Sequence, residues 1–219
     1  MLSCLCPNRI NPYLDFSIDC SFNELLEKLK YAYDSICQPV NNDTHRSLIF
    51  IMQVLNDHSS LINLMNKHGE FLNQIIECVG LYISSHSTVL RRHAVSSLIL
   101  PALMEIQLAM DISQTSVFID TLLLDDLMEY RLLISIFSKM HENDKTLYNK
   151  NHIVNKIINS LTEDRLKLVY YVIWGAEIMF LLGEKKDTIP KEILNAVMKM
   201  KCKITYSPWI TIQAKNHFW

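Results

Sequence analysis

Histidine and cysteine, the side chains best suited to binding a transition metal, are frequent in this chain of 219 residues but widely spaced. The histidines are His45, His58, His68, His86, His93, His141, His152 and His217, and the cysteines are Cys4, Cys6, Cys20, Cys37, Cys78 and Cys202. No histidine stands three or four residues from a second histidine or a cysteine, the spacing that puts two ligands on one helix face. We therefore expect surface or helix-end histidines and no metal or other cofactor.

Nucleophilic catalysis lacks its usual signals in the sequence. A catalytic serine or cysteine needs a base, an orienting group and a special turn, and no G-x-S-x-G or comparable cysteine motif occurs. The acidic pairs Asp125-Asp126 and Glu163-Asp164 stand at expected helix starts, where the helix dipole favours negative charge. The sequence thus predicts no catalytic residues, no small-molecule substrate and no enzyme activity.

The composition is that of a globular protein. Apolar residues make up 49% and charged residues 20%, and only four residues are glycine, which argues against phosphate-binding loops and Rossmann turns. The formal net charge of −2 gives no general attraction to nucleic acid or to acidic membranes.

The N-terminal sequence does not resemble a secretory signal, because Pro7 and Pro12 stand where an apolar segment should run. The cysteines show no paired spacing, and Pro101, Arg131 and Glu177 interrupt the longest apolar runs, so no membrane span is expected. We expect an intracellular protein, nuclear or cytoplasmic, with free thiols.

The stretch 84–110 is the one around which the other elements are expected to pack. Eight of its apolar side chains share one helix face: Val95, Leu98, Ile99, Ala102, Leu103, Ile106, Ala109 and Met110. A helix this apolar must be buried, and the neighbouring segments must form its walls. Pro101 interrupts it, since proline lacks an amide donor and clashes with the carbonyl of Ser97, so a kink or break is expected there.

The remaining pattern predicts an all-α chain. Helices are expected over 22–37, 44–55, 59–67, 70–84, 151–161 and 163–182, with a polar loop over 141–150. The stretch 117–140 should be divided at Asp125-Asp126. Gly69 and Gly183 should end the helices before them, and Thr188 should cap a last helix that runs to about residue 201 with Pro190 in its first turn. We expect an irregular arm over 1–20, one helical domain over 21–202 and an extended tail over 203–219.

One short segment, around residues 89–98, resembles the second-helix signature of HEAT-type and armadillo-type repeats. Leu90-Arg91 is followed by Ala94 and Ser97-Leu98, so small residues admit a neighbouring helix and leucine fills the core. The resemblance implies irregular stacked helical hairpins, as in chromosome-associated solenoids. The acidic residue that usually precedes the arginine is missing and no second copy is visible, so a closed multi-helix bundle is the alternative fold.

Trp174-Gly175 resembles the Trp-Gly pair of Bcl-2-like proteins, which bind amphipathic helices in a groove. The usual flanking residues are replaced by Ile173 and Ala176. A core tryptophan beside a glycine that permits close helix approach explains the same pair.

Partner-binding residues are expected in two places. Arg91 and Arg92 project about 100° apart on a helix, so at least one should be free to bind a carboxylate or phosphate. The tail carries Tyr206, Trp209, Phe218 and Trp219, which should either fold back as a strap or insert into a partner.

We therefore expect a non-catalytic intracellular scaffold or adaptor that binds other proteins within a larger complex. The first alternative is a subunit of a chromosome-associated complex, acting in DNA recombination or chromosome organisation, whose lysine-rich C-terminal end contacts nucleic acid. The second alternative is a Bcl-2-like bundle that binds amphipathic helices.

Overall fold

The computed structural model describes residues 18–104, 119–140, 149–184 and 188–200, and within them every regular element is a helix. This confirms the all-α class. Most of the expected arm and all of the expected tail, with the site residues Tyr206, Trp209, Phe218 and Trp219, lie outside the described residues, as do Ile106, Ala109 and Met110.

Most of the helices begin at a capping side chain. They are α1 (Phe22–Ile36), α2 (Asn42–Asn56), α3 (His58–Leu81), α4 (Thr88–Ser97), α5 (Ile99–Leu103), α7 (Leu127–Lys139), α9 (Lys150–Ser160), α10 (Val169–Leu181) and α11 (Lys191–Lys199), with 3-10 turns at Tyr82–Ser84 and Arg165–Lys167. Side chains of Ser21, Asn41, Asp57, Ser87, Asp126 and Asn149 accept hydrogen bonds from the first-turn amides of α1, α2, α3, α4, α7 and α9. Such caps satisfy amides that the helix itself leaves without an acceptor.

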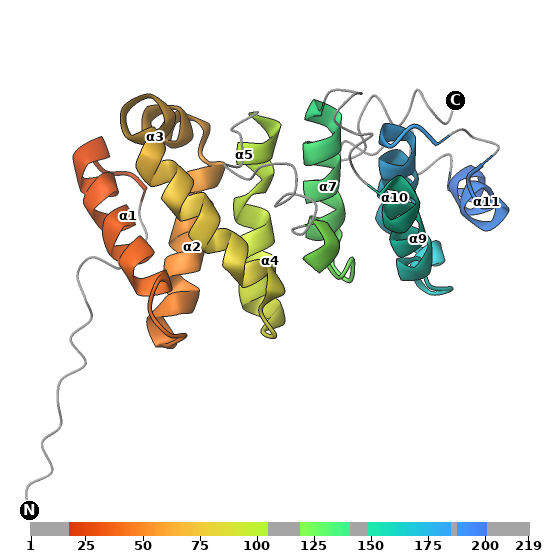
Figure 1. Ribbon diagram of the computed structural model, residues 1–219, viewed down its shortest axis with the longest axis horizontal. Coiled ribbons are helices and arrows are strands. Elements are labelled where there is room, and N and C mark those ends of the chain that lie inside the picture. Colours follow the sequence, from red (N-terminus) through yellow and green to blue (C-terminus); the bar gives the residue numbers. More distant parts are fainter. Residues whose placement is uncertain (1–17, 105–118, 141–148, 185–187, 201–219) are drawn as a thin grey trace, which may run out of the picture.

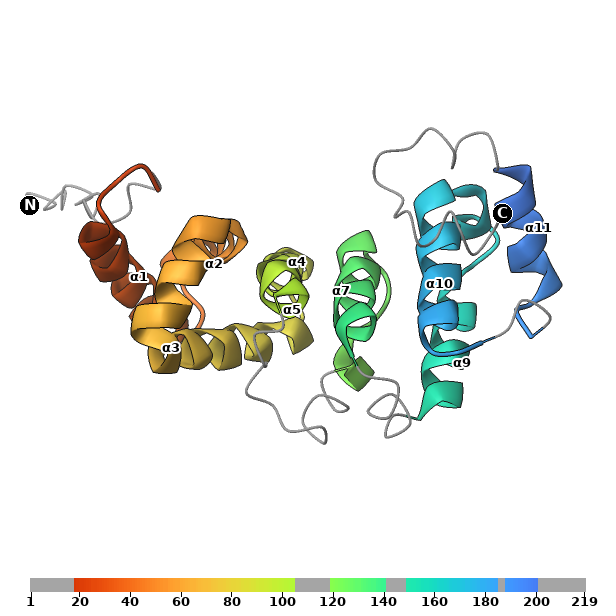
Figure 2. The same cartoon turned by 90° about the horizontal axis from the view of Figure 1, so that it is seen from above.

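The helices pack in a row that follows the chain (Figures 1 and 2). Helix α1 packs on α2, α2 on α4, α4 and α5 on α7, α7 on α10, and α10 on α11, while α3 lies against α1, α2 and α4. Helices α1 and α11 lie at opposite ends of the row, and one core cluster extends along it. The expected HEAT-type repeat stays a prediction, since a row of helices does not by itself establish repeated units.

The stretch 84–110 is interrupted as its proline predicts. Helix α4 ends at Ser97 and Leu98 takes the C-cap position, after which α5 contains Pro101 near its centre. The break falls where proline removes the hydrogen bond to the carbonyl of Ser97. Val95, Leu98, Ile99 and Ala102 are buried, so this face lies in the core as predicted, but Leu103, expected on the same face, is 36% exposed.

Helix α3 kinks at His68, whose φ of −143° and ψ of 41° are not helical. The break between the two expected helices therefore exists, but it falls at His68, and Gly69 is not the left-handed residue that ends a helix. Among the described glycines only Gly183 has a positive φ, of 81°, and it ends α10 as predicted. At Gly69 the chain returns to helix at once, so no left-handed residue is needed.

Two further boundaries differ from the prediction. Helix α10 begins at Val169 rather than near residue 163, because Leu168 has extended backbone angles after the 3-10 turn. Pro190, not Thr188, occupies the N-cap of α11, and the Thr188 hydroxyl donates instead to the Glu184 carboxylate. Within the described residues, none of the helices combines the length and the apolar character that crossing a bilayer requires.

Candidate functional site: a buried arginine hub and a polar groove

The structure assigns Arg91 to the interior. Its side chain is 8% exposed, and its guanidinium donates to the Asp125 carboxylate at 2.8 Å and to the Ser85 carbonyl at 3.3 Å. The carboxylate of Glu129, which is 1% exposed, lies 3.9 Å from the same guanidinium. Arg91 thus joins α4 to the start of α7, and its planar fork of donors suits several acceptors at once.

The Glu129 carboxylate organises the turn that precedes α7. It accepts hydrogen bonds from the backbone N–H groups of Leu123 at 3.2 Å, Asp125 at 2.9 Å and Asp126 at 3.2 Å. Leu124, between them, has a φ of 56°, a strained value for a leucine that these bonds hold in place. Burial raises the pKa of the Glu129 carboxyl, and hydrogen bonds from the amides of Asp126 and Leu123 oppose the shift.

The far side of this turn is held by α10 and the segment before it. The Arg165 guanidinium donates to the carbonyls of Leu124 at 2.8 Å and Asp125 at 3.1 Å, and the Tyr171 hydroxyl also donates to the Asp125 carbonyl, at 3.1 Å. We call Arg91, Asp125, Glu129 and Arg165 the arginine hub. The hub ties α4, α7 and α10 together through one turn.

The two arginines predicted to bind a partner therefore differ. Arg91 is occupied inside the protein, which leaves it no free face for a partner. The Arg92 side chain is 59% exposed and lies 3.4 Å from the Asp126 carboxylate, so it remains accessible. A partner-binding role stays a prediction for Arg92.

Trp174 and Gly175 lie in the core of the C-terminal half. Trp174 is buried, and a Cβ added to Gly175 would stand 3.1 Å from Leu161 Cδ1 and 3.3 Å from Ile157 Cγ2. The missing side chain therefore lets α10 approach α9 closely. The pair is explained by packing, which leaves the Bcl-2-like resemblance without support from its position.

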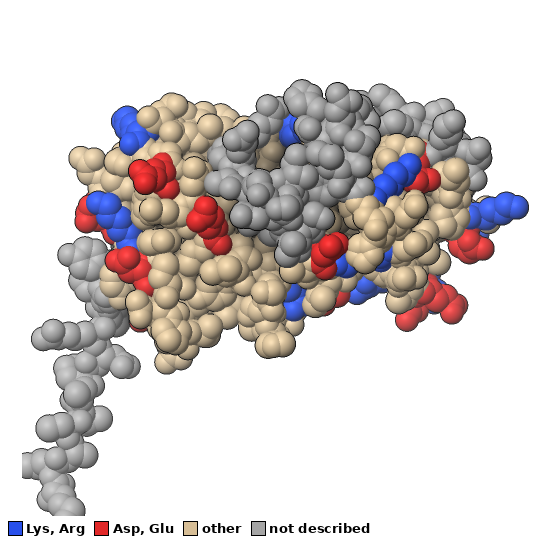
Figure 3. Space-filling view, in the orientation of Figure 1, with Lys and Arg blue, Asp and Glu red and all other residues tan. Residues whose placement is uncertain are grey.

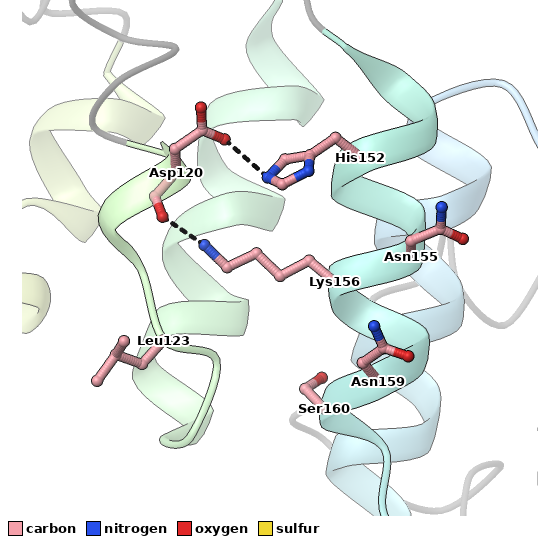
Figure 4. Close-up of a pocket in the computed structure, with 7 residues that line it drawn as sticks. All are labelled: Asp120, Leu123, His152, Asn155, Lys156, Asn159 and Ser160. Atoms are coloured by element: carbon pink, nitrogen blue, oxygen red, sulfur yellow. Dashed lines mark hydrogen bonds and ion pairs between the residues drawn. The ribbon is translucent and has the colours of Figure 1, made fainter.

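A polar groove opens between residues 119–124 and helix α9 (Figure 4). Its volume is about 450 Å³, and its lining residues are Asp120, Leu123, His152, Asn155, Lys156, Asn159 and Ser160. Leu123 is 57% exposed and borders polar side chains. The groove therefore offers one apolar contact among several hydrogen-bonding groups.

Internal contacts fix the two walls of the groove. The Lys156 ammonium donates to the carbonyl of Asp120 at 2.6 Å and to that of Ile119 at 3.4 Å, and His152 Nε2 lies 3.3 Å from the Asp120 carboxylate (Figure 4). Burial lowers the pKa of Lys156, and the negative charge of Asp120 opposes the shift. These bonds connect the segment before α7 to α9.

Asn155 and Asn159 have no such role. Both side chains are exposed and stand four residues apart along α9. Neither side-chain amide is hydrogen-bonded within the described chain. Residues at this spacing are neighbours on one helix face. The Asn-x-x-x-Asn spacing is visible in the sequence, but only the structure shows that a groove runs beside it.

The groove does not bring together a catalytic set. Asp120 and His152 form a pair of the kind that orients a base, but Ser160 lies eight residues further along α9, about 12 Å away. The Ser160 hydroxyl is instead hydrogen-bonded to the Tyr130 hydroxyl and donates to the Ile157 carbonyl. The arrangement suits binding rather than nucleophilic attack.

On the face shown in Figure 3, Lys and Arg side chains are interspersed with Asp and Glu, and the described residues form no patch of a single sign. Among known proteins, no family description, curated sequence or solved structure matches this chain. Function must therefore be inferred from the geometry of the chain itself.

Proposed function

We propose that the chain is a non-catalytic scaffold that binds an extended segment of another protein in the groove beside α9. The observation that carries this proposal is the pair of exposed side-chain amides, Asn155 and Asn159, on the α9 side of a groove whose other side is lined by the exposed Leu123 (Figure 4). The row of packed helices supports it, because such a row exposes a long surface to a partner. Membership of a larger complex in the nucleus or cytoplasm is part of the same proposal.

The chemistry of the two amides matches that of a peptide backbone. A side-chain amide has a donor and an acceptor, as does each peptide group, so one asparagine can pair with both. Residues four apart on a helix are separated by about 6 Å, and alternate residues of an extended chain by about 6.6–6.8 Å. Asn155 and Asn159 can therefore contact successive residues on one side of an extended segment.

The rest of the groove indicates which segments fit. Leu123 offers an apolar contact for one side chain, and Asp120, His152 and Lys156 bring both signs of charge close together. A segment with an apolar residue and no strong net charge suits this lining.

A phage-displayed library of random peptides selected on the full chain tests the proposal. Selected peptides should bind the wild type and should lose about tenfold in affinity for each of Asn155→Ala and Asn159→Ala, since each removed amide takes away hydrogen bonds worth about 1 kcal/mol apiece. Asn195→Ala, on the exposed face of α11, is the matched control and should change nothing. Peptides that bind the double variant as well as the wild type would show that the groove is not the site.

A DNA-binding assay distinguishes the nucleic-acid alternative from the protein-binding scaffold. Binding of fluorescent single-stranded DNA that weakens steeply with added salt would favour the chromosome-associated proposal. Peptide binding without such DNA binding favours the scaffold.

A further inference from the structure

Two histidines far apart in the sequence meet between α2 and α4. His45 Nε2 and His93 Nε2 lie 3.1 Å apart, the ring centroids are 5.0 Å apart, and the ring planes are tilted by 48°. Forty-eight residues separate the two in sequence, so only the packing of α2 on α4 brings them together. The pair lies on different helices from those that form the groove, and its role is independent of the proposed function.

The two facing imidazole rings are chemically suited to binding a metal. A neutral imidazole has one nitrogen with a free lone pair, and histidine is the commonest metal ligand in proteins. Arg92 is the charged neighbour that opposes a cation, and its own guanidinium lies 3.4 Å from the Asp126 carboxylate.

We propose that His45 and His93 together chelate a divalent late transition metal ion, such as nickel, copper or zinc. Metal–nitrogen bonds of about 2.0–2.1 Å separate two nitrogens by about 3.3–3.4 Å at a tetrahedral angle and by about 2.9 Å at a right angle. The observed 3.1 Å lies between these values. A metal can therefore replace the Nε2–Nε2 hydrogen bond and be held by both Nε2 atoms, with side-chain shifts of a few tenths of an ångström and with both rings protonated on Nδ1.

The protein supplies two ligands to this site. Within the described part of the chain no group of three or more His, Cys, Asp or Glu side chains is placed to hold a metal. His45 is exposed and His93 half-buried, so the remaining coordination positions face solvent and are open to water or to a donor from another molecule. Imidazole ligands without thiolates suit nickel, copper and zinc rather than magnesium or calcium.

A metal bound here would connect α2 to α4. Because the two ligands meet only in the folded chain, metal binding stabilises the folded state. Protons compete for the same lone pairs, so affinity should fall as the pH falls below the ordinary pKa of histidine.

Nickel chloride titrated into the full chain by calorimetry tests the site, in thiol-free buffer at pH 7.5 and again at pH 5.5. We expect one nickel ion per chain at pH 7.5 and binding at least about tenfold weaker at pH 5.5. His45→Gln and His93→Gln, which keep a hydrogen-bonding side chain, should each weaken nickel binding at least about tenfold. His86→Gln, an exposed histidine in the loop before α4, is the matched control and should bind as the wild type does.

A second measurement separates this pair from the thiols of Cys37 and Cys78, which lie 3.5 Å apart. Cys37→Ser should leave nickel binding unchanged, and nickel at about a hundredfold above its Kd should raise the thermal midpoint of the wild type by about 5–10 °C. That rise should vanish in His93→Gln. Nickel binding that survives both histidine variants, or that is lost in Cys37→Ser, or that does not occur, would overturn the proposal.

Discussion

Replacing Arg91 by methionine tests the central structural inference, that this arginine is an internal connector. Methionine keeps the length of the side chain but removes the guanidinium, which bonds to Asp125 and Ser85 and faces Glu129. Asp125 is 41% exposed and stays solvated, but Glu129 is buried, so removing the guanidinium 3.9 Å away leaves an uncompensated buried charge, a loss of about 3–5 kcal/mol. Arg91→Met should therefore lower the free energy of unfolding by about that amount at pH 7.5.

The pH dependence of that loss follows from Glu129. Burial already raises the pKa of this carboxyl, and losing the nearby cation raises it further. A pKa that is higher in the folded state than in the unfolded state makes stability fall as pH rises through the interval between them. The deficit of Arg91→Met should accordingly be largest at pH 7.5 and smaller at pH 5, where Glu129 can take up a proton.

Urea unfolding followed by circular dichroism and by tryptophan fluorescence, to which the buried Trp174 contributes, measures both effects. Arg92→Met is the matched control, because its side chain is 59% exposed and such ion pairs contribute about 0–1 kcal/mol. If Arg91→Met and Arg92→Met differ by less than about 1 kcal/mol at pH 7.5, the interior role assigned to Arg91 is refuted.

The remaining predictions concern the core and a cap. Leu98→Ala should lower the unfolding free energy by about 2–5 kcal/mol, because this leucine is fully buried. A loss below about 0.5 kcal/mol in urea titration would show that the junction of α4 and α5 lies at the surface. Hydrogen bonds from Ser60 hold the pKa of the Asp57 carboxyl below its ordinary value. Asp57→Ala should therefore lose about 1 kcal/mol at pH 7. The loss should shrink as the pH falls from about 4 through the lowered pKa of Asp57, at which the folded wild-type carboxylate takes up a proton. A difference that does not shrink at low pH would contradict this role.

Local signals predicted most of the helical framework. The helix start at Asp125-Asp126, the break before Pro101 and the end at Gly183 each depend on backbone chemistry within a few residues. The start of α10 was missed because apolar residues around Leu168 continue the helical pattern although the backbone there is extended. A hydrophobic pattern records which side chains are buried and does not record where the backbone changes direction.

The site residues depend on packing and were less accessible to sequence reasoning. Arg91 stands in a recognisable sequence signature, but the Asp125 carboxylate to which it donates lies 34 residues further along the chain. Whether Arg91 faces solvent or a carboxylate therefore depends on which helix packs beside it. His45 and His93 are paired across 48 residues for the same reason. Helical periodicity relates residues within one helix, whereas these contacts depend on which helices become neighbours.

The arginine hub and the groove share one segment of chain. Leu123 lines the groove, and its backbone N–H is held by the buried Glu129 carboxylate. At the other end of the segment, Lys156 of α9 holds the carbonyl of Asp120. A wall fixed at both ends loses little conformational freedom when a ligand binds, so more of the contact energy contributes to affinity. Under the proposed function, the polar contacts of the hub position a binding surface, which an apolar core of equal volume would not do.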